Sequence, residues 1–311
     1  MSNKLRNSSS THASHDVMTS NLTKRKFNKI FVWLRSQGWR HIVAIAVCVF
    51  AGFPILYIFS ASLNNRGTLV SSNTLFSSIS SDNYYELFHM AQHPYAYWYV
   101  NTVVIGLITA AASVFIGALA AYAFSRLRFT GRRIGLLSII VVQMFPQVLS
   151  IVAIYLLLTK LGEIYPFLGI NSRIALIMVY LGGAMGVNTY LMYGFFNTIP
   201  KEIDEAAQID GAGHARTFFT IILPLVSPIL AVIGLLSFIS TVSEYAVAST
   251  VLVSPEKQTL AVGMYAFVSD RFSQNWGVFS SGAVLAAIPV VVVFLFLQKY
   301  IVSGLTVGAV K

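Results

Sequence analysis

The sequence has few charged residues. Only 10% of its 311 residues are Asp, Glu, Lys or Arg, and 56% are hydrophobic. Soluble globular domains carry roughly 25% charged residues. This scarcity excludes a soluble domain and predicts an all-α integral membrane protein. A membrane β-barrel is not expected, because its strands would appear as shorter segments of alternating hydrophobicity.

Residue patterns of common catalytic and metal sites are also missing. The single Cys48 lies in an apolar run, which excludes a disulfide framework and a thiolate metal site. No G-x-x-x-x-G-K-[ST], H-E-x-x-H or G-x-S-x-G segment occurs. His89 and His93 have the i, i+4 spacing of metal ligands, but no third ligand is nearby and solvent exposure is the simpler interpretation. We therefore expect no catalytic residue, metal or cofactor in this chain.

Long uncharged stretches define the predicted membrane segments. A helix needs about 20 residues to cross the hydrocarbon core. Six stretches are long enough and predict six transmembrane helices within residues 41–311: His41–Asn65, Pro94–Ser125, Ile134–Thr159, Ile174–Pro200, Thr217–Ser243 and Phe272–Gln298. Pro224 and Pro228 are expected to bend the fifth.

Positive charge is distributed unevenly between the two sides. Most of the 21 Lys and Arg residues lie before residue 41, between the second and third stretches, or between the fourth and fifth. The positive-inside rule then places the N- and C-termini in the cytoplasm and explains the net charge of +10 without nucleic acid. Residues 1–40 form a cytoplasmic tail, expected to be partly disordered, whose basic and aromatic second half is expected to contact membrane lipid.

Several uncharged polar residues lie within or beside the predicted spans. Such side chains either join neighbouring helices by hydrogen bonds or line a path for a hydroxyl-rich solute, and the sequence leaves both interpretations open. They are Asn101, Gln143, Asn188, Ser237, Ser240, Thr241 and Ser243. Glu244 is the one acidic candidate at a span boundary, and a proton-coupled carrier is not favoured because buried charges are missing.

Two further patterns have structural interpretations. Gly182 and Gly186 have the spacing that allows close helix packing. An aromatic group after the first external loop is interpreted as an interfacial belt rather than a sugar platform; it comprises Tyr95, Tyr97, Trp98 and Tyr99.

A charged segment, PKEIDEAAQIDGAGHARTFFTIILPL, stands between the fourth and fifth stretches, starting at Pro200. Pro200 and the following acidic residues suit the first turn of a helix, and Gly211 suits its end. Ile203, Ala206 and Ala207 predict one small apolar face. We therefore expect a short cytoplasmic helix, within about residues 200–216, that seats in a groove on another protein.

The same segment carries the spacing E-A-A-x-x-x-G-x9-I-x-L-P. It resembles the signature of binding-protein-dependent ABC importer permeases. Longer phrases, including MFPQVLSIVAIYLLLTKLGEIYPFLGINS and SEYAVASTVLVSPEKQTLAVGM, are similar to the G-type permease subunit of maltose/maltodextrin importers. The matching residues are Glu205, Ala206, Ala207, Gly211, Ile221, Leu223 and Pro224.

The resemblance implies a type I ABC importer permease in a bacterial cell membrane, with both termini cytoplasmic. Its partners would be a second homologous permease, a homodimeric ATP-binding subunit that binds ATP and Mg, and an extracellular sugar-binding protein. Glu205, Ala206, Ala207, Gly211, Leu223 and Pro224 would couple to the ATPase. An external loop with Ser254, Pro255, Glu256 and Lys257 would reach the binding protein.

Three other functions remain open at this point. The machine could import another oligosaccharide or a glycerol phosphoester. The chain could work alone as a secondary carrier, or it could be a membrane enzyme, which the missing catalytic patterns disfavour. Sugar identity, the direct sugar ligands and the role of the N-terminal tail do not follow from the sequence.

Overall fold

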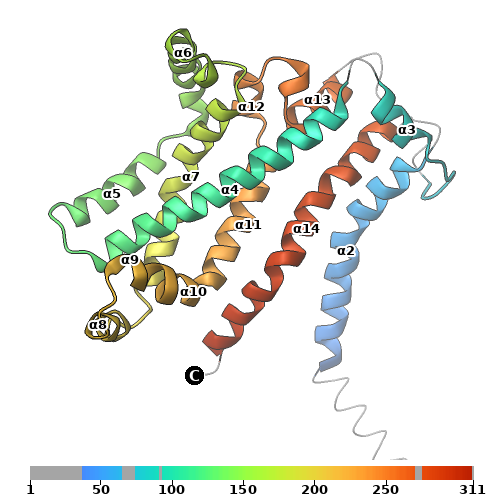
Figure 1. Cartoon of the computed structure of the whole chain (residues 1–311). Coiled ribbons are helices and arrows are strands. Elements are labelled where there is room, and N and C mark those ends of the chain that lie inside the picture. Colours follow the sequence, from blue (N-terminus) through green and yellow to red (C-terminus); the bar gives the residue numbers. More distant parts are fainter. Residues whose placement is uncertain (1–36, 65–73, 91–92, 270–274, 310–311) are drawn as a thin grey trace, which may run out of the picture. The chain divides into compact units, whose positions relative to one another are not determined.

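The computed structural model describes residues 37–64, 74–90, 93–269 and 275–309. These residues form helices, turns and loops, with no strand among them (Figure 1). The predicted tail over residues 1–40 and the first part of the sixth predicted span lie largely outside the described residues. The chain divides into two compact units, Met1–Tyr57 and Ile58–Lys311.

The first unit contains most of one apolar helix. Helix α2 runs over Trp39–Ser62 and includes Pro54, and it is long and apolar enough to cross a membrane. Its side chains up to Tyr57 are mostly exposed. It corresponds to the first predicted span, His41–Asn65.

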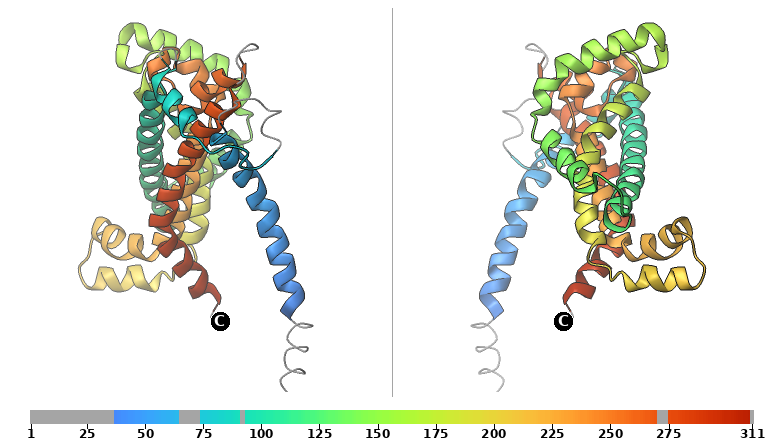
Figure 2. Two further views of the ribbon diagram at one scale, coloured as in Figure 1. Left: turned by 90° about the vertical axis from the view of Figure 1, so that its right-hand side faces the viewer. Right: turned by 90° about the vertical axis from the view of Figure 1, so that its left-hand side faces the viewer.

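The second unit is built around four helices that pack side by side (Figures 1 and 2). Small residues on one face of α4 permit close approach: a Cβ atom at Gly106 would lie 2.8 Å from the Phe238 ring, and one at Gly117 would lie 3.2 Å from the Met192 sulfur. Close contact through small residues is how membrane helices associate without a hydrophobic driving force. The four helices are α4 (Tyr95–Arg126), α7 (Arg173–Phe196), α11 (Ser227–Ser243) and α14 (Trp276–Ala309).

Continuous spans are found at only some of the predicted positions. Among the described residues, three helices are long and apolar enough to cross a membrane, and three bent pairs bring the number to six if each pair is one span. The third predicted span is broken into α5 (Arg132–Gln143) and α6 (Gln147–Ile164), whose axes differ by 101°. Pro146 explains the break, because proline disfavours a helical residue before it and lacks an N–H group. The two parts of α7 differ by 46°.

The bend expected in the fifth span is confirmed. The segments His214–Leu225 and Ser227–Ser243 meet at 77° around Val226, close to Pro224 and Pro228. The part of the span after the bend starts at Ser227, and Thr217, the first residue of the predicted span, lies in the helical part before the bend. The bent portion comprises α9 (His214–Arg216), the π-helix η4 (Thr217–Ile222) and α10 (Leu223–Leu225).

Shorter elements lie at the two ends of the second unit. Helix α8 (Glu202–Ile209) and α9 project together at one end, here named the α8 end (Figure 2). The opposite end is named the η5 end. It carries α3 (Asp82–His89), η3 (Pro166–Leu168), α12 (Ala246–Val251), η5 (Pro255–Lys257) and α13 (Leu260–Ser269).

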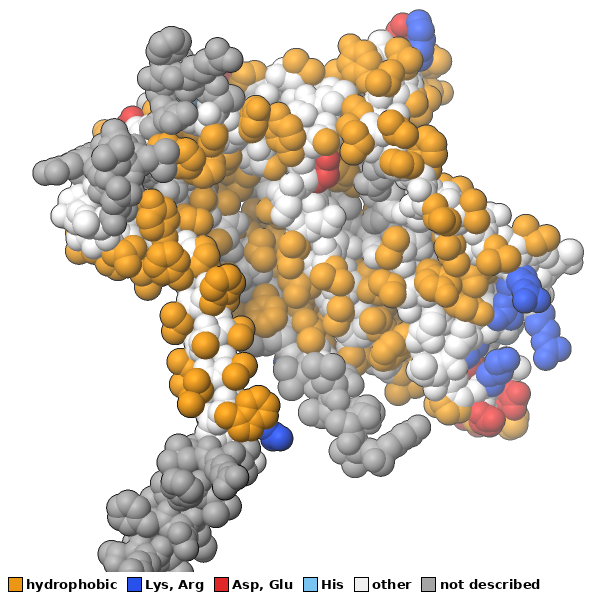
Figure 3. All heavy atoms as spheres, turned by 180° about the vertical axis from the view of Figure 1, so that it is seen from behind, with side chains coloured by type: hydrophobic (Ala, Val, Ile, Leu, Met, Phe, Trp, Pro, Cys, Tyr) orange, Lys and Arg blue, Asp and Glu red, His pale blue; other side chains and the backbone are white. Residues whose placement is uncertain are grey.

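The molecular surface is strongly apolar. Orange apolar side chains are spread over the face in Figure 3, whereas most of the charged side chains lie towards its edges. Ile134, Val142 and Val148 of α5 and α6 are each about 70% exposed (71%, 70% and 71%). Such a surface suits hydrocarbon or another apolar helix rather than water.

The interpretation of all four aromatic residues as an interfacial belt is wrong for two of them. Tyr95 and Trp98 are each only 1% exposed. The Tyr95 hydroxyl donates to the Gly282 carbonyl at 2.8 Å. Both residues pack against α13 and α14, so only the remaining aromatic residues, such as Tyr97 at 57% exposure, are free to reach an interface.

Substitution of Gly263 should destabilise the fold. A Cβ atom at this position would lie 2.1 Å from the Trp98 ring, whose burial prevents it from moving aside. We expect Gly263→Ala to cost about 1–3 kcal/mol through overpacking and to lower the thermal midpoint of the purified protein. Gly194→Ala is the matched control, because nothing lies within 4 Å of its added methyl group. Equal midpoints for the two variants would contradict the packing described.

Candidate functional site

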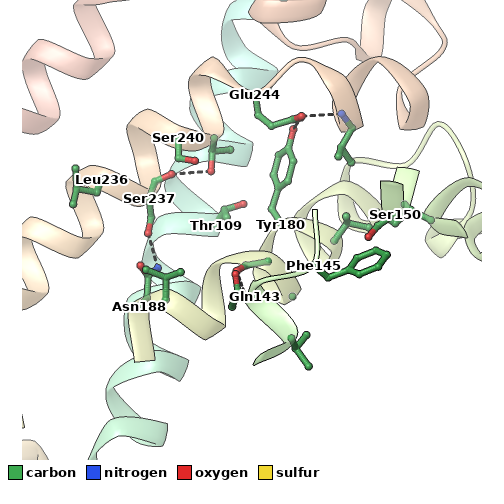
Figure 4. Close-up of a pocket in the computed structure, with 18 of the residues that line it drawn as sticks. Thr109, Gln143, Phe145, Ser150, Tyr180, Asn188, Leu236, Ser237, Ser240 and Glu244 are labelled. Carbon is green, nitrogen blue, oxygen red and sulfur yellow. Dashed lines mark hydrogen bonds between the residues drawn. The ribbon is translucent and has the colours of Figure 1, made fainter. Parts of the chain in front are cut away.

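A cavity of about 860 Å³ opens between α4, the α5–α6 corner, α7, α11 and the start of α12 (Figure 4). Its size lies within the range of about 300–1,000 Å³ usual for small-molecule sites. The polar residues on its wall come from four regions that are distant in sequence. They are Thr109, Gln143, Ser150, Tyr180, Asn188, Ser237, Ser240, Thr241 and Glu244.

Asn188 links three helices on one side of the cavity. Its Nδ2 atom donates to Ser113 Oγ of α4 at 2.7 Å and to Ser237 Oγ of α11 at 2.9 Å. The two serine hydroxyls lie 3.4 Å apart, and the Thr241 hydroxyl donates to the Ser237 carbonyl at 2.9 Å. These polar groups therefore join α4, α7 and α11 beside the cavity.

Glu244 is the one carboxylate on the cavity wall. One carboxylate oxygen accepts a hydrogen bond from the Tyr180 hydroxyl at 2.6 Å, as Figure 4 shows. The backbone N–H groups of Val247 and Ala248 donate to the same carboxylate at 2.8 and 3.0 Å. Because these are the unpaired amides of a helix start, Glu244 fixes α12 against α7.

Gln143 ties the α5 end of the cavity to the bend in α7. Its Nε2 atom donates to the Gly183 carbonyl at 2.8 Å. A Cβ atom at Gly186 would lie 2.2 Å from the same amide, so the predicted close packing holds at Gly186. It does not hold at Gly182, where an added Cβ atom would have no neighbour within 4 Å.

The polar residues predicted within or beside the spans thus lie in different parts of the structure. Five of them line the cavity, whereas Ser243 is exposed beside it and Asn101 lies elsewhere. Thr109 and Tyr180 line the cavity and were missed by sequence reasoning. Thr109 has a sequence signal, because it lies on the small-residue face of α4 between Gly106 and Ser113.

The cavity wall offers hydrogen bonds but no positive charge. Its lining residues include no Lys, Arg or His. Aromatic and aliphatic side chains, including Phe145 and Leu236, fill the spaces between the polar groups. Such a surface suits an uncharged molecule with many hydroxyl groups better than an anion.

Helix α8 forms the second candidate site, and its ends are well defined. It begins at Glu202 rather than in the turn of Pro200, with Lys201 as its N-cap. Its end is the predicted glycine stop: Gly211 has φ of +78°, and the N–H groups of Gly211 and Ala212 donate to the Gln208 and Ala207 carbonyls. This pair of bonds is the Schellman motif, which favours glycine at the left-handed position.

The predicted apolar face of α8 is wrong. Ala207 is 4% exposed and turns inward, whereas Ala206 is exposed, so the two alanines do not share a face. The outward face carries Glu205, Ala206 and Ile209, and the Ile209 side chain is 87% exposed. The helical period of 3.6 residues accounts for this split, because adjacent residues point about 100° apart.

The other motif residues lie in the bent segment. Leu223 packs against the buried cluster that includes Phe196 and Phe218, while Pro224 is exposed. The motif therefore contains surface residues and residues that hold α8 and η4 together.

Side chains of α4 hold the predicted external loop, Ser254 to Lys257, by hydrogen bonds. The Trp98 Nε1–H donates to the Pro255 carbonyl at 2.7 Å, and Asn101 Nδ2 donates to the Glu256 and Gln258 carbonyls, each at 2.9 Å. Asn171 Nδ2 donates to Ser254 Oγ at 2.6 Å. Asn171 and Asn101 thus fix the backbone of the loop, whose outer residues Pro255, Glu256 and Lys257 stay exposed.

The histidine pair does not form a metal site in the structure. The His89 ring stacks on Tyr85 at 3.9 Å, and the His93 ring lies against Trp98 and Phe267. Within the described ranges, no group of three His, Cys, Asp or Glu residues is placed to hold a metal.

Removal of the Asn188 amide should loosen the contact between α4, α7 and α11. We expect Asn188→Ala to lower the free energy of unfolding by about 1 kcal/mol. A second substitution, Ser237→Ala, should lower it little further, because both substitutions remove the hydrogen bond between Asn188 and Ser237. Thermal unfolding of the purified variants measures both effects. Asn197→Ala is the control, because its amide donates within its own helix, to the Tyr193 carbonyl. Additive effects of the two substitutions would contradict the linkage.

Known proteins share both the sequence and the arrangement of these helices. Residues 113–307 match the family described as "Binding-protein-dependent transport system inner membrane component". The chain is 39% identical over 272 residues to the galactooligosaccharides transport system permease protein GanQ of Bacillus subtilis, covering 87% of this chain and 94% of GanQ. It is 37% identical over 289 residues to the maltodextrin transport system permease protein MdxG of the same organism, covering 93% and 98% of the two chains.

Relatives and solved structures from other sources agree. The maltose/maltodextrin transport system permease protein MalG of Escherichia coli K12 is 36% identical over 282 residues, covering 87% of this chain and 94% of MalG. A chain of a bacterial ABC transporter involved in import of the acidic polysaccharide alginate has a TM-score of 0.67 and 28% identity, covering 86% of this chain and 97% of that chain. The family match over more than half of the sequence, the relatives above 30% identity and the shared fold have one meaning: the chain is a membrane permease that belongs to the inner membrane components of binding-protein-dependent ABC transport systems.

Proposed function

We propose that this permease imports maltose and maltodextrins by alternating access, driven by ATP hydrolysis in partner subunits. The observation that carries the proposal is the cavity among α4, α7 and α11, whose wall bears hydroxyl and amide groups without a basic side chain. Neutral sugars are recognised by such groups, together with aromatic rings such as Phe145. The similarity to MdxG and MalG supports maltodextrin among the neutral sugars.

Two relatives point to other sugars. The alginate transporter handles an acidic polysaccharide. A polymer with a carboxylate on each unit would need compensating positive charge, and Glu244 would instead repel it. A glycerol phosphoester is disfavoured for the same reason. A galactooligosaccharide, suggested by GanQ, is neutral and remains the second candidate.

The exposed face of α8 is the proposed contact with a homodimeric ATP-binding subunit. It presents Glu202 and Glu205 beside Ala206 and the almost fully exposed Ile209. An apolar side chain left in water on a short helix suits a pocket on another protein. The partner subunit would bind ATP and Mg and hydrolyse the ATP, and this chain would have no catalytic role. Gly211 and Pro224 would keep the helix and its bent support rigid.

The η5 end is the proposed contact with an extracellular sugar-binding protein. The loop there keeps Pro255, Glu256 and Lys257 exposed on a backbone fixed by Trp98 and Asn101. A preformed loop loses little conformational entropy on binding. A second homologous permease would cover the exposed apolar side chains of α5 and α6 and close the cavity from the other side.

Uptake competition should identify the sugar. In cells or proteoliposomes with the complete transporter, unlabelled maltose and maltotriose should suppress uptake of radiolabelled maltotriose, because they fit a neutral hydroxyl-binding cavity. Galactooligosaccharides, alginate oligomers and glycerol phosphoesters form the rest of the panel. Suppression by galactooligosaccharides alone would select the second candidate, and suppression by alginate would contradict the neutral-sugar assignment. Uptake by this chain without any ATPase subunit would show a secondary carrier instead.

Charge reversal on α8 should uncouple transport. We expect Glu205→Lys to reduce sugar uptake by at least about tenfold, a loss of more than about 1.4 kcal/mol of coupling, while the bundle still folds. Gly211→Asp should act similarly, because it disturbs the left-handed turn that ends α8. Glu163→Lys is the control, since it reverses an exposed charge on α6. Normal uptake by both α8 variants would show that α8 does not couple the two subunits.

A further inference from the structure

Arg126 and Asp204 form an ion pair that little water reaches. Arg126 is the last residue of α4, and its Nε atom lies 2.8 Å from Oδ2 of Asp204 in α8. The two side chains are only 5% and 11% exposed. The other ion pair in the described part of the chain, Lys160 with Glu163, has side chains that are 77% and 60% exposed. An exposed pair stabilises little, whereas loss of one member of a buried pair strands the other charge.

The same end of α4 holds the chain on both sides of α8. Arg126 Nη2 donates to the Ile199 carbonyl at 2.9 Å, just before the helix. Tyr122, one turn earlier on α4, directs its hydroxyl to the His214 carbonyl at 3.4 Å, just after the helix. Arg126 and Tyr122 therefore contact the chain at three places: before α8, within α8 and after α8.

Apolar packing alone holds α8 weakly. Of its eight residues, only Asp204 and Ala207 are buried, and Ile203 is half-buried. An isolated helix of this length is unstable in water, so its orientation depends on tertiary contacts. The buried ion pair is the one contact between charged groups among them, and the same guanidinium group also donates through Nη2 to the Ile199 carbonyl, so that it holds two points of the α8 segment at once.

We propose that Arg126 is a positioning residue, which holds α8 at a fixed angle on α4 through Asp204 and the Ile199 carbonyl. Movement imposed on the exposed face of α8 then passes to α4 instead of being absorbed by rotation of α8. The proposal rests on the proposed function, in which a partner subunit moves α8. The pair has no part in the cavity, so its role is mechanical and not sugar binding.

The test uses the complete transporter with its partner subunits. Cys48→Ser removes the single cysteine of the chain, and Gln208→Cys places a spin label on the exposed side of α8. Label mobility, complex yield and sugar molecules transported per ATP hydrolysed are measured, with the sugar that the competition panel selects. The parent with these two changes is the reference, and Arg128→Ala is the matched control at an exposed arginine two positions away.

Arg126→Ala should increase the mobility of the label and lower the transport per ATP by about tenfold. Asp204→Ala should do the same. The variant with both substitutions should be no worse than either alone, because no unpaired charge remains. Arg126→Lys should restore part of the coupling, since it keeps the charge but lacks the second nitrogen that holds the Ile199 carbonyl.

Parent-like mobility and transport per ATP in Arg126→Ala would overturn the proposal. A lower yield with normal transport per ATP in the complexes that remain would overturn it as well, because Arg126 would then serve folding only. Failure of the proposed function looks different: Glu205→Lys would leave uptake unchanged while Arg126→Ala still loosened the label.

Discussion

A polar group taken out of water needs a partner within the protein, and this constraint applies to the buried polar side chains that join the described helices. Three such contacts lie where helices meet. Asn188 joins three helices beside the cavity, Glu244 joins α7 to α12, and Arg126 joins α4 to α8. The apolar residues supply the bulk of the packing, but these contacts determine which faces meet and at what angle.

The architecture was largely predictable from composition, and the breaks in it were not. Runs of uncharged residues predict where the chain enters the membrane because burial in hydrocarbon depends only on side-chain transfer energy. The same runs carried no sign that the third span turns by 101° after Gln143. Pro224 and Pro228 were interpreted as a bend, whereas Pro146, which has the same chemistry, was placed inside a continuous helix.

The α8 segment shows the limit of local reasoning more sharply. Its helix, its glycine stop and its neighbouring bend follow from contacts within a few residues, and the structure has all three. The acidic residues after Pro200, Asp204 among them, were interpreted only as residues that suit a first helical turn, because the partner of Asp204, Arg126, lies at the end of another helix. The inward turn of Ala207 and the outward turn of Ile209 likewise depend on what α8 packs against, which no spacing within the segment reveals.

Helix α4 contacts different partners near its two ends, and these two contacts together fix the number of residues between them. Asn101 holds the outer loop and Arg126 holds α8. One residue inserted between them would rotate one grip against the other by about 100° and shift it by about 1.5 Å. Natural variation in length should therefore be confined to the connections between helices, and alignments of related chains should pass through this stretch without a gap.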